Sequence, residues 1–352
     1  MVNPDDPSPA VPEDLPRHRR RPRYAGKHPR KFQEKYKELR PDLYPETVAR
    51  VLASGKTPAG SHVPIMVTEV LDHLQPRAGQ RLVDCTLGHG GHARRILSRL
   101  QPEGHLLGLD VDPKEQARTE AQLRKEGFGP DIFSVQRSNF AGIKRALAMQ
   151  GWEKVHGILA DLGVSSMQLD EPERGFSYKL EGPLDMRMNP DKGSPASEWI
   201  RNSTPEELST ILHQNADEPQ AVLLGQELAG QNLSSTSELK MQITQALPGL
   251  NGEEQIKTMR RVFQALRIAV NEEFKSLETL LKHAPDCLES GGHIVILSFH
   301  SGEDRRVKRA FQEGLQQGLY AQIADQPLRP SPAECRANPR ASSTKLRWAR
   351  RS

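Results

Sequence analysis

The sequence predicts an α/β fold built on a parallel, doubly wound sheet, and two observations carry this prediction. From His62 to Asp161, short apolar runs of strand length alternate with segments that have helical patterning. The same rhythm resumes at Gly292, after a long stretch that shows only helical patterning. Strands that alternate with helices form parallel sheets, because a parallel neighbour requires a long crossover connection.

Local patterns define the individual elements. The expected strands are 81–86, 105–110, 131–136, 156–161, 292–298 and 344–349. The expected helices are 67–74, 90–100, 113–125, 141–150 and 303–316, with one more helix at 262–281. Pro113 and Pro205 suit the first turn of a helix, and Thr204 is expected to cap the second of these.

The pattern divides the chain into three parts. Residues 1–60 are rich in proline and charge, and we expect a disordered extension with at most one short helix near 30–40. Residues 61–172 and 262–352 are expected to form one α/β domain. Residues 173–261 are expected to be a helical domain inserted between the fourth and fifth strands, where a substrate would be recognised.

Composition excludes several classes of protein. No run of 18 apolar residues is present, so no membrane span is expected, and the N-terminus has no apolar core of a secretory signal. Three widely separated cysteines, Cys85, Cys287 and Cys335, predict neither a disulfide framework nor a zinc ribbon. A cytoplasmic protein fits these observations.

Positive charge is concentrated at the two ends of the chain. Residues 17–40 carry a charge of +9 and residues 329–352 carry +6, although the whole chain has a formal net charge of +4. This asymmetry indicates a polyanionic partner held by the basic ends. A solubilising tail without a partner is the alternative for the N-terminal run.

A glycine-rich turn and an acid after the next strand predict a cofactor site. Gly88-His-Gly-Gly-His-Ala93 follows the first strand and opens a helix, and glycines there let the backbone approach a ligand closely. Asp110 ends the second strand and is placed to bind both ribose hydroxyls of an adenosine cofactor. Taken alone, this signal also allows a nicotinamide dinucleotide.

Three further residues near this turn have two interpretations each. Phe140 follows the third strand and lies either against a purine or in the core. His89 and His92 are three residues apart without a recognisable third ligand, so packing against the loop is favoured over a zinc site and no metal is expected. His300, after the fifth strand, faces the site or serves as a core or loop hydrogen-bonding group.

The fourth strand is followed by a long polar loop, DLGVSSMQLDEPERGFSYKLEGPLDMRM (161–188). Ligands of open α/β sheets bind outside the carboxyl ends of the strands, and long ordered loops are usually functional. An ordinary surface loop is the alternative, but packing does not explain so many hydrogen-bonding side chains.

At this point the chain resembles the bacterial S-adenosylmethionine-dependent small-subunit ribosomal RNA cytosine-N4 methyltransferases of the MraW type. The resemblance runs from His62 to about Arg350, and residues 1–60 have no counterpart in it. It is carried by the polar loop 161–190 and by HVPIMVTEVLDHL (62–74), VDCTLGHGGHARRIL (83–97), LDVDP (109–113), FQALRIAVNEEF (263–274), SFHSGEDRRVK (298–308) and NPRASSTKLRWARR (338–351).

The resemblance implies a Rossmann-like class I methyltransferase sheet with an inserted helical domain. It also implies S-adenosyl-L-methionine as cofactor and a target cytosine in the decoding region of the small subunit, in an assembled or nearly assembled particle. A homodimer stays open. Transferred to this chain, the cofactor contacts fall on Gly90, Gly91, His92, Asp110, Phe140, Asp161 and Gln168.

Chemical reasoning selects the remaining candidates. Asp161, Ser165, Ser166 and His300 are candidates for activating the acceptor amine, because a hydrogen-bond acceptor can pull its nitrogen towards tetrahedral geometry. Candidates for phosphate contact are Arg174, Arg187, Lys345 and Arg347. Two other classes are weighed beside this one: a methyltransferase fold used only as a ribosome-assembly binding factor, and a dinucleotide oxidoreductase.

Overall fold

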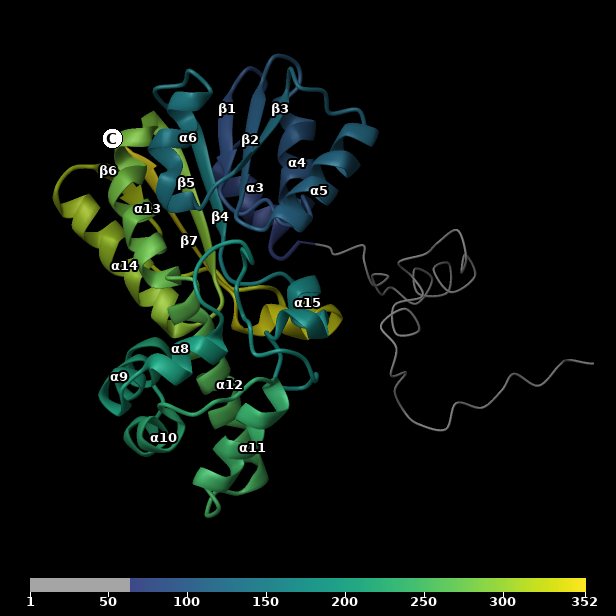
Figure 1. Ribbon diagram of the computed structural model, residues 1–352. Helices are drawn as coiled ribbons and strands as arrows, with labels where there is room; N and C mark the ends of the chain where they lie inside the picture. The colour runs from purple at the N-terminus through teal and green to yellow at the C-terminus, as the bar shows by residue number, and fades with distance from the viewer. Residues whose placement is uncertain (1–63) are drawn as a thin grey trace, which may run out of the picture.

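The computed structural model describes residues 64–352 of the chain. The expected helix near 30–40 and the basic run 17–40 lie outside the described residues. The centre of the described part is one seven-stranded sheet with the order β3-β2-β1-β4-β5-β7-β6 (Figure 1). Its strands are β1 (Arg81–Asp84), β2 (His105–Asp110), β3 (Phe133–Arg137), β4 (Val155–Asp161), β5 (Leu288–Ser298), β6 (Tyr320–Ile323) and β7 (Lys345–Arg351).

Strands β1 to β5 are parallel, so their carboxyl ends meet at one edge of the sheet. Asp84 is in register with Leu159 of β4, and Asp161 is in register with Leu297 of β5. The strand order reverses between β1 and β4, which is where an open α/β sheet forms its ligand crevice. β7 is antiparallel to both β5 and β6.

Alternating apolar side chains bury the two faces of the sheet under different helices. Leu82, Leu106 and Leu159 point to a core shared with α3 (Val67–Leu74), α4 (Gly91–Leu100) and α5 (Pro113–Lys125). Their neighbours, such as Val83 and Ile158, point to the opposite core. That core is covered by α6 (Ile143–Met149), α13 (Glu273–Cys287) and α14 (Ser301–Gln316). The parallel, doubly wound arrangement predicted from the sequence is confirmed.

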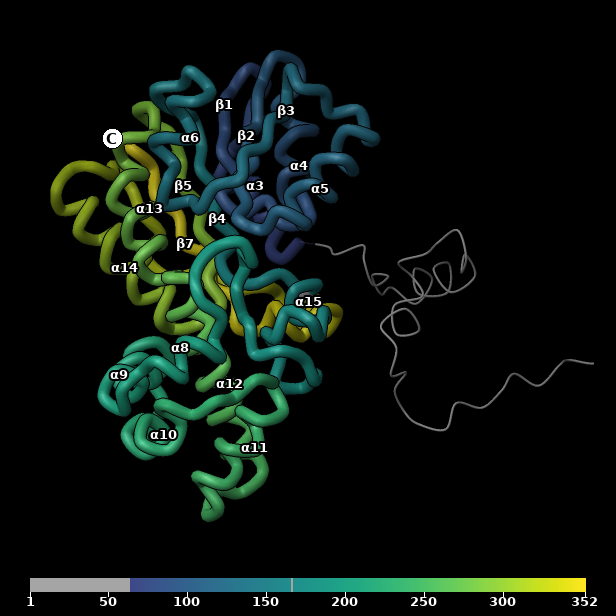
Figure 2. Tube along the Cα trace, viewed as in Figure 1, coloured from purple at the N-terminus to yellow at the C-terminus, as the bar shows by residue number. Residues whose placement is uncertain are grey.

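The chain between β4 and β5 is helical, as predicted, and its part before α13 lies beyond the carboxyl edge of the sheet (Figures 1 and 2). It begins with α7 (Ser166–Asp170) and η3 (Pro172–Arg174) and continues with α8 (Ala196–Asn202), α9 (Pro205–Ala216), α10 (Ala221–Leu228), α11 (Thr236–Ala246) and α12 (Gly252–Val270). A core that extends from Phe176 to Leu266 holds this helical unit together. Thr204 caps α9 with Pro205 in its first turn, as predicted.

The expectation of a single helix over 262–281 is wrong. α12 ends at Val270, α13 begins at Glu273, and Glu272 between them has a left-handed backbone with φ of 48°. The Asn271 side chain donates to the carbonyl oxygen of Met186 and accepts from the N–H of Met188. These bonds tie the break to the polar loop, so a contact distant in sequence ends the helix.

The structure also contains elements that the patterns did not predict. They are β6, the short helices α7 and η3, η2 (Phe140–Gly142), α15 (Pro332–Ala337) and η4 (Pro339–Ser343). In the described residues, no helix combines the length and apolar character that a membrane crossing requires.

Candidate functional site

The glycine turn connects β1 to α4 and is sterically dependent on glycine. Gly90 has φ of +69°, and a Cβ atom there would lie 2.9 Å from Cγ2 of Thr119. A Cβ atom on Gly91 would lie 3.1 Å from the ring of Pro64. Both predicted cofactor residues therefore belong to a backbone that has no room for side chains and passes close to the sheet edge.

Asp110 ends β2 and faces this turn. Its Oδ2 accepts from the N–H of Gly88 at 2.8 Å, and its Oδ1 accepts from the N–H of Asp112 at 2.8 Å. Burial raises the pKa of Asp110, while these two hydrogen bonds act in the opposite direction. Each carboxylate oxygen has two lone pairs, so both can still accept a hydroxyl of a ligand.

Asp161, Asp84 and His92 meet where β1 and β4 end. The N–H of Asp161 donates to Oγ1 of Thr86 at 2.7 Å, and the N–H of Thr86 donates to Asp84 at 3.1 Å. His92 Nε2 lies 3.6 Å from Asp161 Oδ2. Oδ1 of Asp161 and Nε2 of His92 are buried without a hydrogen-bond partner among the described residues. Unpartnered buried polar atoms are rare in native proteins, so this pair is suited to meet a polar ligand.

Asp84 is a site residue that the sequence reasoning missed. Burial raises its pKa to about 6, the charge of His92 opposes this shift, and Asp161 and Asp110 add to it. Three carboxyl groups and one imidazole thus share the carboxyl edge of β1, β2 and β4. Perturbed carboxyl groups gather at functional sites more than elsewhere. The available signal was the position of Asp84 at the end of an apolar strand, directly before the glycine turn.

Gln168 and Ser165 lie in the first turn after β4 and hold each other. Ser165 Oγ accepts from the N–H of Gln168, and Gln168 Oε1 accepts from the N–H of Ser165, which forms a capping box on α7. The amide of Gln168 also donates to Oδ2 of Asp112 at 2.9 Å. Ser166 is the first residue of α7. The polar loop is therefore tied back to the end of β2, beside Asp110.

Phe140 and His300 also lie at the carboxyl edge of the sheet, but their side chains contact residues outside the cluster of Asp84, Asp161 and His92. Phe140 begins η2 and packs, half-buried, against the core under α6 and α13. Nε2 of His300 lies 3.2 Å from Oε1 of Glu303, and its ring centroid lies 5.8 Å from that of Phe274. Burial would raise the pKa of Glu303, but contacts with His300, the N–H of Phe299 and the charge of Arg267 together outweigh burial, so the pKa is lowered. The structure places the ring of His300 beside the carboxylate of Glu303 after β5.

The prediction of phosphate contacts for Arg174 and Arg347 needs correction. The side chain of Arg174 is only 9% exposed, and its Nη1 donates to Asp112 at 2.7 Å. Its Nη2 donates to the carbonyl oxygens of Arg187 and Met188. Arg347 is 7% exposed and donates to Asp304 at 2.7 Å. Both guanidinium groups are buried and pair with a carboxylate of the protein, so the structure gives them an internal role in place of an exposed phosphate contact.

Arg187 and Lys345 are half-buried and stay predictions as phosphate contacts. Arg187 forms two hydrogen bonds of 2.8 Å with Asp185, and Lys345 donates to Asp304 at 2.7 Å. The structure adds an exposed basic segment that the sequence reasoning did not select. Arg340 of η4 lies 3.3 Å from Asp170 of α7, and exposed Arg336 belongs to the adjoining α15. This segment flanks the polar loop (Figure 1).

The two histidines of the glycine turn are not arranged around a metal. His89 Nε2 lies 3.0 Å from Oε2 of Glu115, whereas His92 is directed at Asp161. Within residues 64–352, no group of three or more His, Cys, Asp or Glu side chains is placed to hold a metal ion.

Comparison with known proteins agrees with this architecture. Three relatives carry the name Ribosomal RNA small subunit methyltransferase H, two of them with a final number. The protein from Lachnoclostridium phytofermentans is 45% identical over 343 residues, which cover 95% of this chain and 93% of the relative. That from Alkaliphilus metalliredigens is 46% identical over 339 residues, covering 94% and 97%. That from Heliobacterium modesticaldum is 40% identical over 308 residues, covering 82% and 97%.

Two conclusions follow from these matches. Coverage of 95% exceeds what residues 61–352 alone supply, so single relatives also align with part of residues 1–60, whereas the family pattern itself begins at residue 59, as expected. The predicted Rossmann-like class I methyltransferase sheet, with helices inserted between β4 and β5, is confirmed. Residues 59–352 match the MraW methylase family, and the chain belongs to that family.

Proposed function

We propose that this protein transfers a methyl group from S-adenosyl-L-methionine to the exocyclic N4 amine of a cytidine in the decoding region of small-subunit ribosomal RNA. Membership of a methylase family supports methyl transfer, and relatives named as small-subunit ribosomal RNA methyltransferases support the RNA class. The observation that carries the proposal is the buried, unpartnered Oδ1 of Asp161 at the end of β4, beside His92 and Asp84.

The residues at the carboxyl edge fit the cofactor. Asp110 offers two carboxylate oxygens to ribose hydroxyls, and the glycine turn brings backbone close to the same place. His92 and Gln168 border this turn and the polar loop, respectively. When bound, S-adenosylmethionine supplies a methyl group on a positively charged sulfur. The acidic cluster of Asp84, Asp110 and Asp161 would favour that positive charge.

The location of Asp161 at the end of β4 supports a role in assisting the acceptor. The lone pair of the cytosine amine is delocalised into the ring, so the amine is a weak nucleophile. A carboxylate that accepts an amine hydrogen draws the nitrogen towards tetrahedral geometry. The nitrogen becomes strongly acidic as the new bond forms, so its proton leaves without a strong base. We propose Asp161 for this role, with Ser165 and Ser166 as neighbours on the same loop and His300 as a residue that positions the start of α14.

The target base must leave its stack to reach this edge. Cytosine N4 takes part in base pairing and stacking within RNA, and enzymes that modify bases extrude them into a pocket. Arg187, Lys345 and the segment of Arg336 and Arg340 are at least partly exposed and are proposed to contact phosphates. We place the reaction in the cytoplasm, on an assembled or nearly assembled small subunit. A homodimer is compatible with this proposal.

Two measurements test the proposal. Calorimetric titration is expected to show binding of S-adenosylmethionine and none of NAD, which separates methyl transfer from hydride transfer. Incubation with methyl-labelled S-adenosylmethionine and purified small subunits, followed by digestion to nucleosides, is expected to place the label in N4-methylcytidine. Label only in 5-methylcytidine or in another nucleoside would refute the proposed acceptor atom, and no label at all would favour a binding factor.

A further inference from the structure

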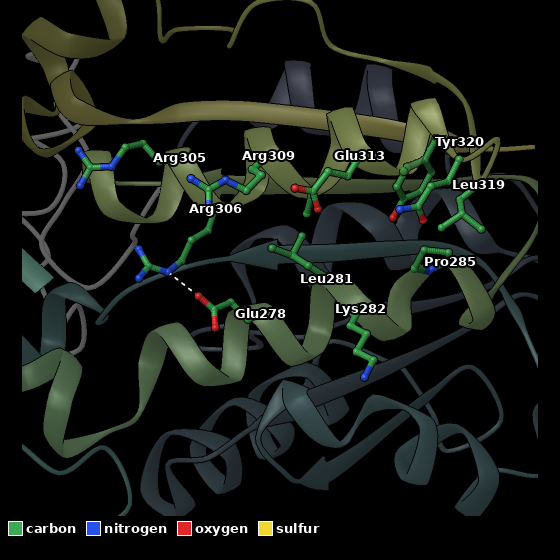
Figure 3. A pocket seen from close by; sticks show the side chains of 13 residues that line it. Glu278, Leu281, Lys282, Pro285, Arg305, Arg306, Arg309, Glu313, Leu319 and Tyr320 are labelled. Carbon is green, nitrogen blue, oxygen red and sulfur yellow. Dashed lines mark hydrogen bonds and ion pairs between the residues drawn. The ribbon is translucent and has the colours of Figure 1, made fainter. Parts of the chain in front are cut away.

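A groove of about 560 Å³ lies between α13 and α14, outside the site described above. Figure 3 shows Arg305, Arg306, Arg309 and Glu313 along α14, opposite the side chains of α13. Leu281 and Pro285 of α13, with Ala310 and Leu319, supply its apolar surface. The groove therefore joins an apolar floor to a rim of charged side chains.

Two of the arginines in this groove are already neutralised. Arg305 lies 3.1 Å from Asp217, and Arg306 lies 2.9 Å from Glu278, the pair drawn in Figure 3. The guanidinium of Arg306 also lies over the ring of Phe274 at 3.5 Å. These contacts fix the first turns of α14 against α9 and α13, so both arginines have structural roles.

The other two cations of the groove are free. Arg309 and Lys282 are exposed, lie on opposite walls, and have no ion-pair partner among the residues that the structure describes. Glu313, also exposed, has no such partner either. The groove thus presents two unpaired cations and one unpaired carboxylate, together with the Arg306–Glu278 pair. This balance suits an anion that is long enough to meet both walls.

Helix α14, which forms one wall of the groove, begins at the edge where the proposed reaction takes place. α14 begins at Ser301, directly after β5 and His300, and Arg305 contacts Asp217 at the end of α9. From Arg305 to Gln316 the helix extends about 16 Å at its usual rise of about 1.5 Å per residue. A strand that enters the carboxyl edge between sheet and inserted helices can therefore continue along α14.

We propose that the groove between α13 and α14 binds the phosphate backbone of the RNA strand that leads away from the target nucleotide, through Arg309 and Lys282. This inference rests on the proposed function, since it takes the same RNA as its ligand. Lysine and arginine contacts to phosphates release counterions and give affinity that is independent of sequence. The apolar floor is suited to the sugars and base faces between those phosphates.

Charge-reversal variants with a matched control test this assignment. Arg309→Glu and Lys282→Glu are compared with Lys308→Glu, which reverses an exposed cation on the same helix outside the groove. The measurement is the affinity for purified small subunits across a series of salt concentrations. Each groove variant should weaken binding about tenfold at low salt and lower the salt slope by about 0.7, the single-strand value per phosphate contact. Lys308→Glu should change both much less.

The variant Glu313→Gln should change the affinity for small subunits in the opposite direction. Removal of the unpaired carboxylate should strengthen binding about two- to threefold, as expected when one repulsive charge near a phosphate is lost. All variants should keep the wild-type S-adenosylmethionine affinity and unfolding temperature, because the groove is separate from the carboxyl cluster.

The outcomes distinguish this inference from the proposed function. If the wild-type protein methylates small-subunit RNA but the groove variants bind like wild type, or no worse than Lys308→Glu, the groove does not hold this strand. The same result is expected if the groove binds an acidic protein and not RNA. If the wild-type protein itself transfers no methyl group to small-subunit RNA, the proposed function fails first.

Discussion

Asp112 and Arg174 form a buried ion pair that joins the end of β2 to the polar loop after β4. Arg174 Nη1 donates to Asp112 Oδ2 at 2.7 Å, and the Asp112 side chain has no exposed surface. The same carboxylate caps α5 through the N–H groups of Lys114 and Glu115 and accepts from Gln168. One carboxylate therefore fixes the loop that begins with Asp161 relative to the strand that ends with Asp110.

Loss of this pair should destabilise the protein strongly. We expect Asp112→Ala to lower the free energy of unfolding by about 3–5 kcal/mol, because the charge of Arg174 would stay buried without an opposite charge beside it. The measurement is urea unfolding, with Arg305→Ala as control because Arg305 and Asp217 form an exposed pair. Equal losses of unfolding free energy in the two variants would show that the buried Asp112–Arg174 pair stabilises the protein no more than the exposed pair does.

The Asp112–Arg174 pair also predicts that the stability of the protein depends on pH. Burial would raise the pKa of Asp112, but hydrogen bonds from Gln168 and Arg174 lower it below its ordinary 3.8. The stability that this lowered pKa supplies is present above pH 3.8 and is lost as the pH falls through the folded value. The stability difference between wild type and Asp112→Ala should therefore shrink as the pH falls below 3.8. A difference that stays constant on acidification would contradict this assignment.

Asp110 should control cofactor affinity. Asp110→Ala removes hydrogen bonds to a charged group, each worth roughly 1.5–3 kcal/mol, so S-adenosylmethionine should bind about ten- to a hundredfold more weakly. Asp110→Asn keeps one acceptor oxygen for the N–H of Gly88 or Asp112 and controls for loss of the turn. Calorimetry gives the affinity and thermal unfolding reports the fold. Unchanged affinity in a folded Asp110→Ala protein would remove Asp110 from the site.

Asp161 should control the chemical step. Loss of one preorganised electrostatic group at a reacting centre typically costs about 10²–10³ in rate, and we expect a decrease of this size in kcat for Asp161→Ala. Asp161→Asn keeps an acceptor oxygen without the charge and should retain part of the activity. Single-turnover methyl transfer with saturating cofactor measures the effect. If both variants react at the wild-type rate, Asp161 is structural and Ser165 and Ser166 become the leading candidates.

Asp84 should reduce stability at neutral pH. Its folded pKa of about 6 exceeds the ordinary 3.8, so the folded protein binds the proton more tightly and loses stability as the pH rises between these values. Asp84→Asn removes this loss and should raise the free energy of unfolding at neutral pH by on the order of 2–3 kcal/mol. The gain should vanish at low pH. Urea unfolding at several pH values checks it, and a variant no more stable than wild type at neutral pH would contradict the raised pKa.

The sequence predicted the parts of the fold that local patterns determine. Strand and helix alternation located β1 to β5, and the glycine turn with Asp110 located the edge where the cofactor is proposed to bind, because both depend on residues that are close in sequence. The break at Asn271 was not predicted, since it depends on hydrogen bonds to Met186 and Met188. A helical pattern that continues across the break gives no sign of such a contact.

In the candidate site, too, features set by local sequence were predicted and features set by distant contacts were not. Asp161 lies at the carboxyl edge as expected, because the end of a buried strand is visible in the sequence. Arg174 and Arg347 were candidates for phosphate contact, but each pairs with a carboxylate from a distant element, Asp112 or Asp304. Only the folded chain shows which cations are neutralised in this way. The same information separates Arg309 and Lys282 from the paired arginines of α14.

The most direct test of the proposed function is to locate the methyl group on the RNA. Small subunits that lack the modification are incubated with S-adenosylmethionine and either the wild-type protein or Asp161→Ala, and the decoding-region fragments are then mapped by mass. We predict one added methyl group, on N4 of a single cytidine, with the wild-type protein and almost none with the variant. Methylation outside the decoding region, on another atom, or equally by both proteins would contradict the account.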